Sequence, residues 1–358
     1  MTQTKTATRE TATREAPDTG TPGSELLLEW LHGATAARLL ETVTRMNLAE
    51  VIGDRVADLT ELARHYGIPP DRLRRLMRAL IDLGLCAEHR PDGYALTALG
   101  GLLHPDRPGS LHHLVRLYTD PITQRSWSNL EASLRTGRAG FVEAYGMPIF
   151  DYLADRPTLA TTYHATMSLL TERIATVVAE HFDFGRFATV TDVGGGDGTL
   201  LREILGRHPG VRGVLVDNAE VVATAAAKFA AAGVGDRCAI APGDFFEAVP
   251  AGSDLYLLKW ILHDWDDDRA AMILRRCREA MPGRGRLMVI ERVLPVTTAP
   301  GVPRDPALSD LHMLAIYGGQ VRTLTEFQAL FRRAGLRFVA VRPLPGVDHV
   351  HLIEAAVG

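Results

Sequence analysis

Short apolar runs alternate with stretches of helical periodicity through the second half of the chain. The runs have the length of buried strands, and the segments between them, such as 199–205 and 269–280, repeat apolar residues at helical spacing. This alternation predicts an α/β fold with a mainly parallel sheet and helices on both faces. The runs predicted as strands are 190–193, 214–216, 238–241, 255–258 and 286–291, of which 238–241 is the weakest.

The end of the chain has a different pattern. Two β-type runs, at 337–344 and 349–356, are separated by the turn-forming sequence PGVD. We therefore expect an antiparallel hairpin that closes the parallel sheet.

The N-terminal part of the chain has mainly helical periodicity. The helical periodicity covers residues 26–52. Residues 58–82 have the pattern of two helices, and Thr60 is predicted as the N-cap of the first. Residues 85–96 are typical of a β-hairpin. Two helices followed by a hairpin predict a winged-helix module.

Composition and pattern together divide the chain into four parts. Residues 1–23 repeat TATRE and cannot bury a core, so they are predicted to be a disordered tail. The winged-helix-like domain is expected at 24–105 and a helical linker at 106–180. The domain built on the predicted sheet follows at 181–358.

Charge, cysteine usage and hydropathy argue against several classes of protein. A net charge of −4 argues against a nucleic acid or an anionic membrane as the main partner. Cys86, Cys238 and Cys277 have no C-x-x-C spacing, which indicates a reduced, cytoplasmic protein without disulfides or a metal site. No apolar run approaches the length of a membrane span, about 18 residues.

The winged-helix pattern supports a rival hypothesis, a DNA-binding regulator. The second helix of the module contains Arg72, Arg74, Arg75 and Arg78, which are suited to contact phosphates. A solvated helix face explains the same arginines more simply, and we favour it.

A glycine cluster at the end of the first predicted strand indicates a nucleotide-type ligand. Residues 190–201 read VTDVGGGDGTLL, in which Gly194, Gly196 and Gly198 allow the backbone to approach a ligand closely. Asp192 and the acid at position 197 would repel a pyrophosphate. They suit the ammonium and sulfonium groups of S-adenosylmethionine (SAM).

Acids also follow the next two predicted strands. Asp217 lies about 20 residues beyond the loop, where an acid accepts hydrogen bonds from ribose hydroxyls. Asp244 and Phe245 in the sequence GDFF are suited to the exocyclic amine and the ring face of adenine. Acids at three successive strand ends predict a SAM site.

The motifs DVGGGDG, GDFF, LKWILHDWDDD and GGxxRT resemble those of the SAM-dependent small-molecule O-methyltransferases. The similarity is to the plant caffeate-type enzymes and to bacterial enzymes acting on aromatic polyketides, and it extends from about Leu26 onward. It implies a Rossmann-like, seven-stranded class I methyltransferase sheet. It also implies that the winged-helix domain forms a homodimer and binds no nucleic acid.

The resemblance assigns the chemistry to the histidine of the KWILHDW string. His263 is expected to act as the general base that removes the proton of a phenol, with Glu291 fixing its ring. Asp264 matches a further position of the motif and is expected to belong to the same catalytic group. The implied function is methylation of a hydroxyl on an aromatic, polyketide-like secondary metabolite, with S-adenosylhomocysteine (SAH) as product and no metal.

The same resemblance places two groups of residues around the reacting atoms. The segment 127–155, which reads as loop-like, and the helix after it would line the acceptor pocket, and 294–306 would cross over the site. Residues expected to bind SAM are Asp192, Gly194, Gly196, Asp217, Asp244, Phe245, Lys259, Trp265 and Met167. Residues expected to bind the substrate are Trp127, Phe150, Trp260, Asp310 and Met313.

One position departs from the plant enzymes. Their GGxER string contains a second glutamate, but Val321 occupies that position here, and a valine cannot orient an imidazole. Some bacterial members of the family bind SAM and perform hydroxylation or decarboxylation instead. A methyltransferase-like hydroxylase or decarboxylase is therefore an alternative.

Overall fold

The computed structural model describes residues 23–296 and 305–358. The chain forms two compact units that divide between Gly100 and Gly101. The predicted tail, except for Gly23, lies outside the described residues, as do positions 297–304 of the predicted excursion over the site. The four-part division of the chain stays a prediction. No helix in the described ranges is both long and apolar enough to cross a membrane.

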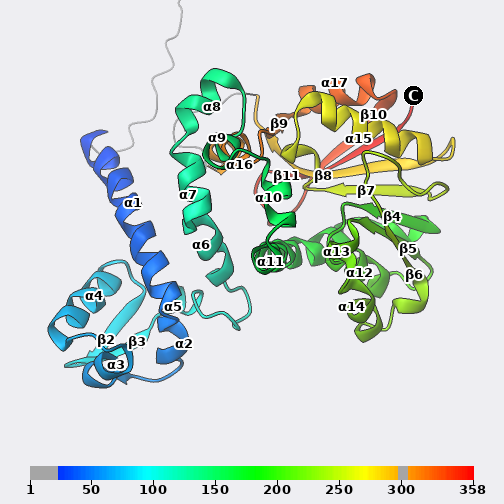
Figure 1. Cartoon of the computed structure of the whole chain (residues 1–358). Helices are drawn as coiled ribbons and strands as arrows, with labels where there is room; N and C mark the ends of the chain where they lie inside the picture. The colour runs from blue at the N-terminus through cyan, green and yellow to red at the C-terminus, as the bar shows by residue number, and fades with distance from the viewer. Residues whose placement is uncertain (1–22, 297–304) are drawn as a thin grey trace, which may run out of the picture. The chain divides into compact units, whose positions relative to one another are not determined.

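The N-terminal unit combines helices with a three-stranded antiparallel sheet in the order β1-β3-β2 (Figure 1). The two predicted helices and the hairpin are confirmed as α3 and α4 and as β2 and β3. The elements of this unit are α1 (Gly23–Arg45), α2 (Leu48–Ile52), β1 (Ala57–Asp58), α3 (Leu59–Tyr66), α4 (Pro70–Asp82), β2 (Cys86–Arg90), β3 (Gly93–Leu96) and, at the boundary, α5 (Ala98–Gly101).

The N-cap of α3 differs from the predicted one. The Asp58 carboxylate accepts hydrogen bonds from the backbone N–H groups of Thr60, at 2.8 Å, and Glu61, at 3.3 Å. A carboxylate at this position satisfies free helix donors and faces the positive end of the helix dipole. The prediction of Thr60 as the cap is wrong, because Thr60 is already inside the first turn.

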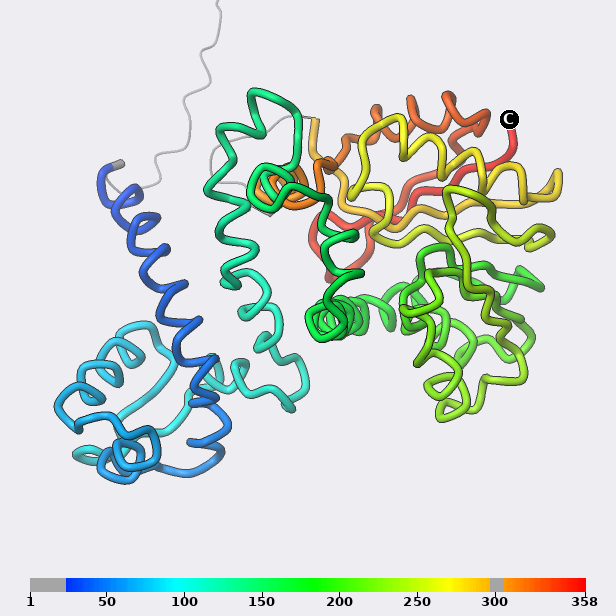
Figure 2. The backbone as a smooth tube through the Cα atoms, in the orientation of Figure 1, coloured from blue at the N-terminus to red at the C-terminus, as the bar shows by residue number. Residues whose placement is uncertain are grey.

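The larger unit is built on a mixed sheet in the order β10-β11-β8-β7-β4-β5-β6. Neighbouring strands from β8 to β6 pair in parallel, and β11 pairs antiparallel with both β8 and β10. Figure 2 shows this C-terminal hairpin, in red, running beside β8. The predicted closing hairpin is confirmed. The strands are β4 (Thr189–Val193), β5 (Arg212–Asp217), β6 (Cys238–Pro242), β7 (Leu255–Lys259), β8 (Arg286–Leu294), β10 (Leu336–Pro343) and β11 (Val350–Val357), and β9 (Arg322–Thr323) pairs with β8.

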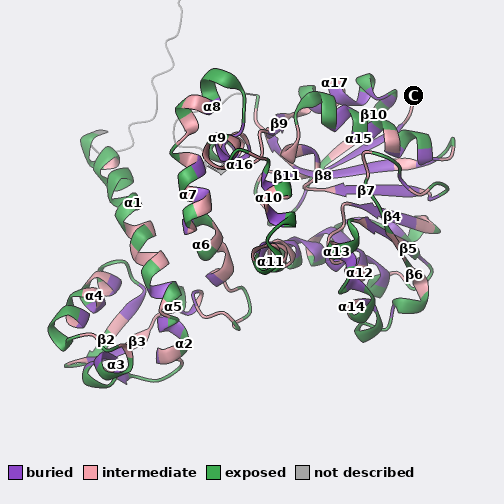
Figure 3. Ribbon diagram, in the orientation of Figure 1, coloured by how far each residue is buried: buried purple, intermediate pink, exposed green. Residues whose placement is uncertain are grey.

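Both faces of this sheet are covered, so its central strands are buried (Figure 3). Alternate residues of β7 show how the faces are divided: Leu255 and Leu257 pack on one side, and Tyr256 and Leu258 on the other. The first side is covered by α11 (Pro157–His181), α12 (Thr199–Arg207), α13 (Ala219–Val222) and α14 (Ala225–Ala231). The second is covered by α15 (Asp267–Ala280) and α17 (Leu324–Arg333).

A helical subdomain is formed by the segment before the sheet together with one helix that follows β8. Residues 127–155 are largely helical, so the loop-like prediction is wrong. The aromatic residues that interrupted its periodicity form a core around Phe141, Tyr163 and Ile316. The helices are α6 (His112–Thr119), α7 (Pro121–Trp127), α8 (Leu130–Thr136), α9 (Gly140–Tyr145), α10 (Ile149–Ala154) and α16 (Asp305–Ile316), which packs against α7, α8 and α9.

Candidate active site

The glycine loop lies between the end of β4 and the start of α12. Gly198 is the N-cap of α12 with φ of 81°, a left-handed conformation that favours glycine. A Cβ on Gly195 would lie 2.6 Å from the carboxylate carbon of Asp192, so no side chain fits there. The loop therefore presents bare backbone beside the Asp192 carboxylate.

The buried Asp192 and the half-buried Lys259 place opposite charges near each other at the carboxyl ends of β4 and β7. Asp192 is 1% exposed, and its Oδ2 atom has no hydrogen-bond partner among the described residues. Burial raises the pKa of Asp192 to about 7, against the opposing charge of Lys259. Burial likewise lowers the pKa of Lys259, whose ammonium donates to Thr171 Oγ1 at 2.8 Å. An unsatisfied buried carboxylate fits a cationic ligand such as SAM.

The second predicted acid, Asp217, supports the glycine loop directly. Its Oδ2 atom accepts from the N–H of Gly196 at 2.9 Å, and Oδ1 accepts from Asn218 N–H at 2.8 Å. Burial raises the pKa of Asp217, although these backbone hydrogen bonds oppose the shift. Asp217 is therefore part of the hydrogen-bonded frame that holds the glycine loop.

Asp197 has its own partners in the protein. It forms an ion pair with Lys228 and accepts hydrogen bonds from Ser168 and Thr199. Although burial favours its neutral form, these bonds together lower the pKa of Asp197. Its charge is therefore compensated, and Asp192 is left as the loop acid facing a cation.

The predicted adenine residues lie in the turn after β6. Asp244 is exposed, and its Oδ1 atom accepts from Phe246 N–H at 2.8 Å. Phe245 is partly buried, and its ring lies 3.4 Å from the position of a Cβ on Gly194. Its centroid is 6.5 Å from that of Trp265, so the structure brings these three predicted residues to one side of the loop.

His263 lies in a short 3₁₀ turn (Leu262–Asp264) just beyond β7. Its Nδ1 atom is 2.7 Å from Oε2 of Glu291, which is fully buried on β8, and its backbone N–H donates to Oε1 at 3.3 Å. The Nε2 atom lies 3.4 Å from Oδ1 of Asp264. The structure therefore unites the three predicted catalytic residues, with the imidazole held between two carboxyl groups.

The electrostatics of this group favour a protonated imidazole. Burial is the largest single influence and disfavours the charge, but Glu291 and Asp264 together outweigh it and raise the pKa of His263. Burial raises the pKa of Asp264 to about 7, with Glu291 adding to the shift and His263 opposing it. His263 and Asp264 influence each other's pKa and therefore titrate as an interacting pair.

The turn that contains His263 is braced by the GGQVRT segment. Arg322 is fully buried and donates to the carbonyls of Leu262, at 2.7 Å, and Trp265, at 2.8 Å. Its guanidinium also pairs with Asp267 at 2.9 Å. A Cβ on Gly319 would lie 2.0 Å from the carbonyl oxygen of His263. The motif was noted in the sequence only as a family feature, and its role as a brace required the structure.

The acceptor side of the site is aromatic. Phe150 lies 5.7 Å from both Trp265 and Tyr317, measured between ring centroids. The Tyr317 hydroxyl is 2.7 Å from that of Tyr163 on α11. Burial raises the pKa of both tyrosines, with the charge of Asp264 contributing, so both hydroxyls stay protonated. Met167 packs with this cluster one turn along α11.

Of the other predicted substrate residues, Trp127 packs with this cluster, whereas Trp260 packs against the core on the α11 side of the sheet. Trp127 donates its indole N–H to Nδ1 of His312 at 3.1 Å. Met313 is 7% exposed, and Asp310 accepts from Val321 N–H at 2.8 Å. Trp260 follows β7 with a left-handed φ of 55°, and its indole nitrogen is buried without a partner among the described residues. Such strain is concentrated at functional sites.

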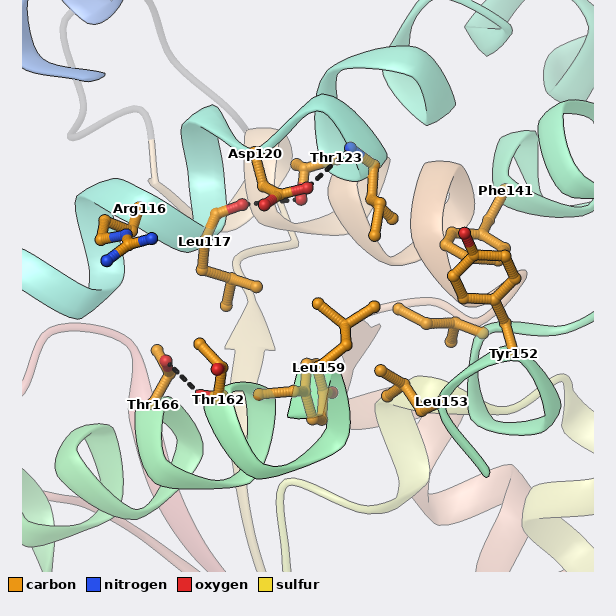
Figure 4. Close-up of a pocket in the computed structure, with 13 residues that line it drawn as sticks. Arg116, Leu117, Asp120, Thr123, Phe141, Tyr152, Leu153, Leu159, Thr162 and Thr166 are labelled. Atoms are coloured by element: carbon orange, nitrogen blue, oxygen red, sulfur yellow. Dashed lines mark hydrogen bonds between the residues drawn. The ribbon is translucent and has the colours of Figure 1, made fainter. Parts of the chain in front are cut away.

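A pocket opens beside this cluster, between the short helices and α11 (Figure 4). Leu117 forms part of one wall, and Leu159 and Thr162 of α11 form part of the other. Tyr163 lines the pocket while its hydroxyl contacts Tyr317. Part of its lining comes from segment 127–155 and the helix after it, the two elements expected to line the acceptor pocket, whereas its wall at 116–123 was not predicted. In the part of the chain that the structure describes, no cluster of His, Cys, Asp and Glu could hold a metal ion.

Comparison with known families agrees with this geometry. A family model described as an O-methyltransferase domain matches residues 127–337, and one described as an O-methyltransferase dimerisation domain matches residues 28–106. The chain belongs to the O-methyltransferase family. The predicted class I methyltransferase fold, with a helical dimerisation domain, is confirmed.

Individual relatives span nearly the whole chain. O-demethylpuromycin-O-methyltransferase from Streptomyces alboniger is 40% identical over 93% of this chain and 89% of its own. Aclacinomycin 10-hydroxylase RdmB from Streptomyces purpurascens is 32% identical over 89% of this chain and 86% of its own. The second shows that the family also contains a protein named for another reaction.

Solved structures of the family add the cofactor. LaPhzM superposes with a TM-score of 0.87 at 34% identity, covering 94% of this chain and all of that one. NcsB1, solved with SAM and 2-hydroxy-5-methyl naphthoic acid, has a TM-score of 0.76 at 31% identity, covering 90% and 96% of the two chains. The prediction of an O-methyltransferase that uses SAM is confirmed.

Proposed function

We propose that this enzyme transfers the methyl group of SAM to a phenolic hydroxyl of an aromatic secondary metabolite, and that His263 removes the hydroxyl proton. The observation that carries the proposal is the 2.7 Å contact between His263 Nδ1 and the buried Glu291. In the neutral ring this contact places the proton on Nδ1 and leaves the lone pair on Nε2. Nε2 is then the base.

A base is useful because a phenol is mostly protonated at neutral pH, with a pKa of about 10. Removing its proton at a fixed position typically gives a rate gain of about 10²–10⁴-fold. Glu291 stabilises the imidazolium that forms, since its carboxylate stays within hydrogen-bonding distance. Bound SAM supplies an electrophilic methyl group on a sulfonium.

Glu291 performs this orienting role without the second glutamate of the plant enzymes. Val321 occupies that position with 5% exposure, and its backbone N–H is bound by Asp310. Glu291 alone nevertheless holds His263 at two points, the ring at Nδ1 and the main chain at the backbone N–H. The substitution therefore leaves the imidazole oriented, which supports methyl transfer.

The cofactor residues are proposed from their positions around the loop. Asp192 would face the positive groups of SAM, Asp217 the ribose hydroxyls, and Asp244 with Phe245 the adenine. Gly194 and Gly196 supply close backbone approach. Met167, Lys259 and Trp265 would border the methionine part of the cofactor.

The acceptor residues are proposed from the aromatic cluster. Phe150 and Trp265 lie in tilted contact, with ring centroids 5.7 Å apart, and the aromatic surface that they form suits a flat ring packed against it. Met313, Trp127 and Trp260 would complete the walls of this site, with Asp310 fixing the backbone at Val321.

We also propose that the chain forms a homodimer through its N-terminal unit. The dimerisation-domain match covers this unit, and α1 exposes large apolar side chains. Leu27 is 57% exposed and Leu31 is 68% exposed, which is unusual for neighbouring leucines on one helix. Light scattering should report twice the chain mass, and a monomer at micromolar concentration would contradict this.

The proposed reaction is tested by incubating the protein and SAM with a panel of phenols. We expect SAH to form in step with a methyl ether of at least one phenol. SAM binding without SAH release from any phenol would contradict the reaction while leaving the cofactor site intact. An oxidised product instead of a methyl ether would favour the hydroxylase alternative.

The rival DNA-binding hypothesis has a specific difficulty in the structure. Arg74 of α4 forms a two-point ion pair with Asp92 at the tip of the hairpin, at 2.9 and 3.0 Å. One of the four arginines needed for phosphate contact is thus held by the module itself. A shift of random duplex DNA at low protein concentration would revive that hypothesis.

A further inference from the structure

His312 is a buried histidine that no motif of the sequence identified. It lies on α16, one residue before Met313, and is 9% exposed. Its ring stacks on Tyr118, with centroids 4.9 Å apart and planes at 4°. Tyr317, which belongs to the acceptor cluster, lies 6.5 Å away. The imidazole is therefore held in a fixed orientation beside the proposed substrate site.

The hydrogen bond from Trp127 determines the tautomer of this ring. An indole N–H can only donate, so Nδ1 of His312, 3.1 Å away, must be an unprotonated acceptor. In the neutral imidazole the proton is then on Nε2. Nε2 has no hydrogen-bond partner among the described residues.

The surroundings of the ring also keep it uncharged. Burial lowers the pKa of His312 to about 4, and the positive charges of His263 and Arg292 add to the shift. Both Trp127, which donates to His312, and Tyr317, whose ring lies 6.5 Å from it, pack with the aromatic cluster that contains Tyr163. His312 is thus a neutral donor with a single direction across the whole physiological pH range.

We infer that His312 selects substrates by donating its Nε2–H to a carbonyl oxygen next to the hydroxyl that is methylated. This inference rests on the proposed function for its location in the acceptor site. A neutral donor forms a hydrogen bond with a ketone, quinone or carboxyl oxygen and so increases the affinity for rings that contain one. It adds no affinity for a ring without such an oxygen. Trp127 is then a positioning residue, because it acts by fixing the tautomer of His312.

The test compares two naphthols of the same shape in the presence of SAH. 1-Acetyl-2-naphthol has a carbonyl beside its hydroxyl, and 1-isopropyl-2-naphthol has none. We expect calorimetry to show about tenfold tighter binding of the ketone, the effect of one hydrogen bond. Equal affinities, or no binding of the ketone, would overturn the inference.

Two substitutions assign the preference to Nε2–H. His312→Met keeps the volume but removes the donor, so the two naphthols should bind equally. His312→Gln places an amide N–H near the same position and should retain most of the preference. If both variants discriminate like the wild type, or if both lose SAH binding as well, the inference is wrong.

The binding preference for the ketone can be measured whether or not methyl transfer occurs. Ketone preference is a binding measurement and does not require turnover. Preference without methylation of either naphthol, or of any phenol in the panel, would contradict the proposed reaction only. Methylation without preference would contradict the role of His312 only.

Discussion

The two sides of the site are built in different ways. On the proposed cofactor side, Asp192 and Asp217 lie at the ends of the neighbouring strands β4 and β5, and the glycine loop follows β4, so the contacts are made close to where each strand ends. On the acceptor side, the key contacts join distant segments, such as Tyr163 with Tyr317 and Trp127 with His312, which are 185 residues apart. The first side is fixed by contacts near the ends of strands, and the second by contacts between segments that are remote in the sequence.

The largest expected effect is on turnover when His263 is replaced, and it should leave the affinity for SAM nearly unchanged. His263→Ala should lower kcat for an ordinary phenol by about 10²–10⁴-fold, because the proton is no longer removed by a positioned base. The Kd for SAM should change by less than about threefold, since the hydrogen bonds and ion pairs of the His263 side chain among the described residues are to Glu291 and Asp264. Stopped assays of SAH and calorimetry measure the two quantities. A parallel loss of SAM affinity would show that the two sides are not independent.

The same difference determines what the sequence predicts. The strands, the loop and the acids at their ends are predicted because local periodicity and short motifs encode them. The short helices of 127–155 were mistaken for a loop, because aromatic residues that pack against α16 break their amphipathic pattern. The contacts of His312 and Arg322 cannot be predicted from the local sequence pattern, because their partners are remote in the sequence.

A second substitution removes the brace behind His263. Arg322→Met should leave the buried carbonyls of Leu262 and Trp265 without donors, at a cost of about 1–3 kcal/mol for each. The free energy of unfolding in urea should fall accordingly, and kcat should fall with it. Arg333→Met is a matched control, because this arginine is 42% exposed and pairs with Asp268, which is 88% exposed. Equal destabilisation by both would contradict the bracing role.

On the cofactor side, Asp217→Ala should weaken SAM binding by about 10–100-fold. The substitution removes a charge-assisted acceptor for the ribose and releases the N–H of Gly196. With SAM saturating, kcat should remain within a few-fold of the wild type. Asp236→Ala, on an exposed turn, serves as the control. Unchanged calorimetric affinity in Asp217→Ala would remove the ribose assignment.

A smaller effect concerns pH. The free base form of His263 is needed, and its pKa is raised, so kcat/KM should rise with pH through an inflection above the ordinary histidine value. Asp264 titrates with it, so the profile belongs to the pair. Glu291→Gln removes a charge that raises both pKa values, and the inflection should move to lower pH. An inflection at an unchanged pH would mean that Glu291 does not influence the pKa of His263.

The acidity of the acceptor tests the central claim most directly. Wild type and His263→Ala are compared on a series of phenols of similar size, from phenol itself to nitrophenols that ionise near neutral pH. If the His263–Glu291 pair removes the proton, the rate deficit of the variant should shrink steadily as the phenol becomes more acidic and nearly vanish for phenols already ionised. A deficit that is the same for every phenol would contradict the account and leave His263 a role in placement alone.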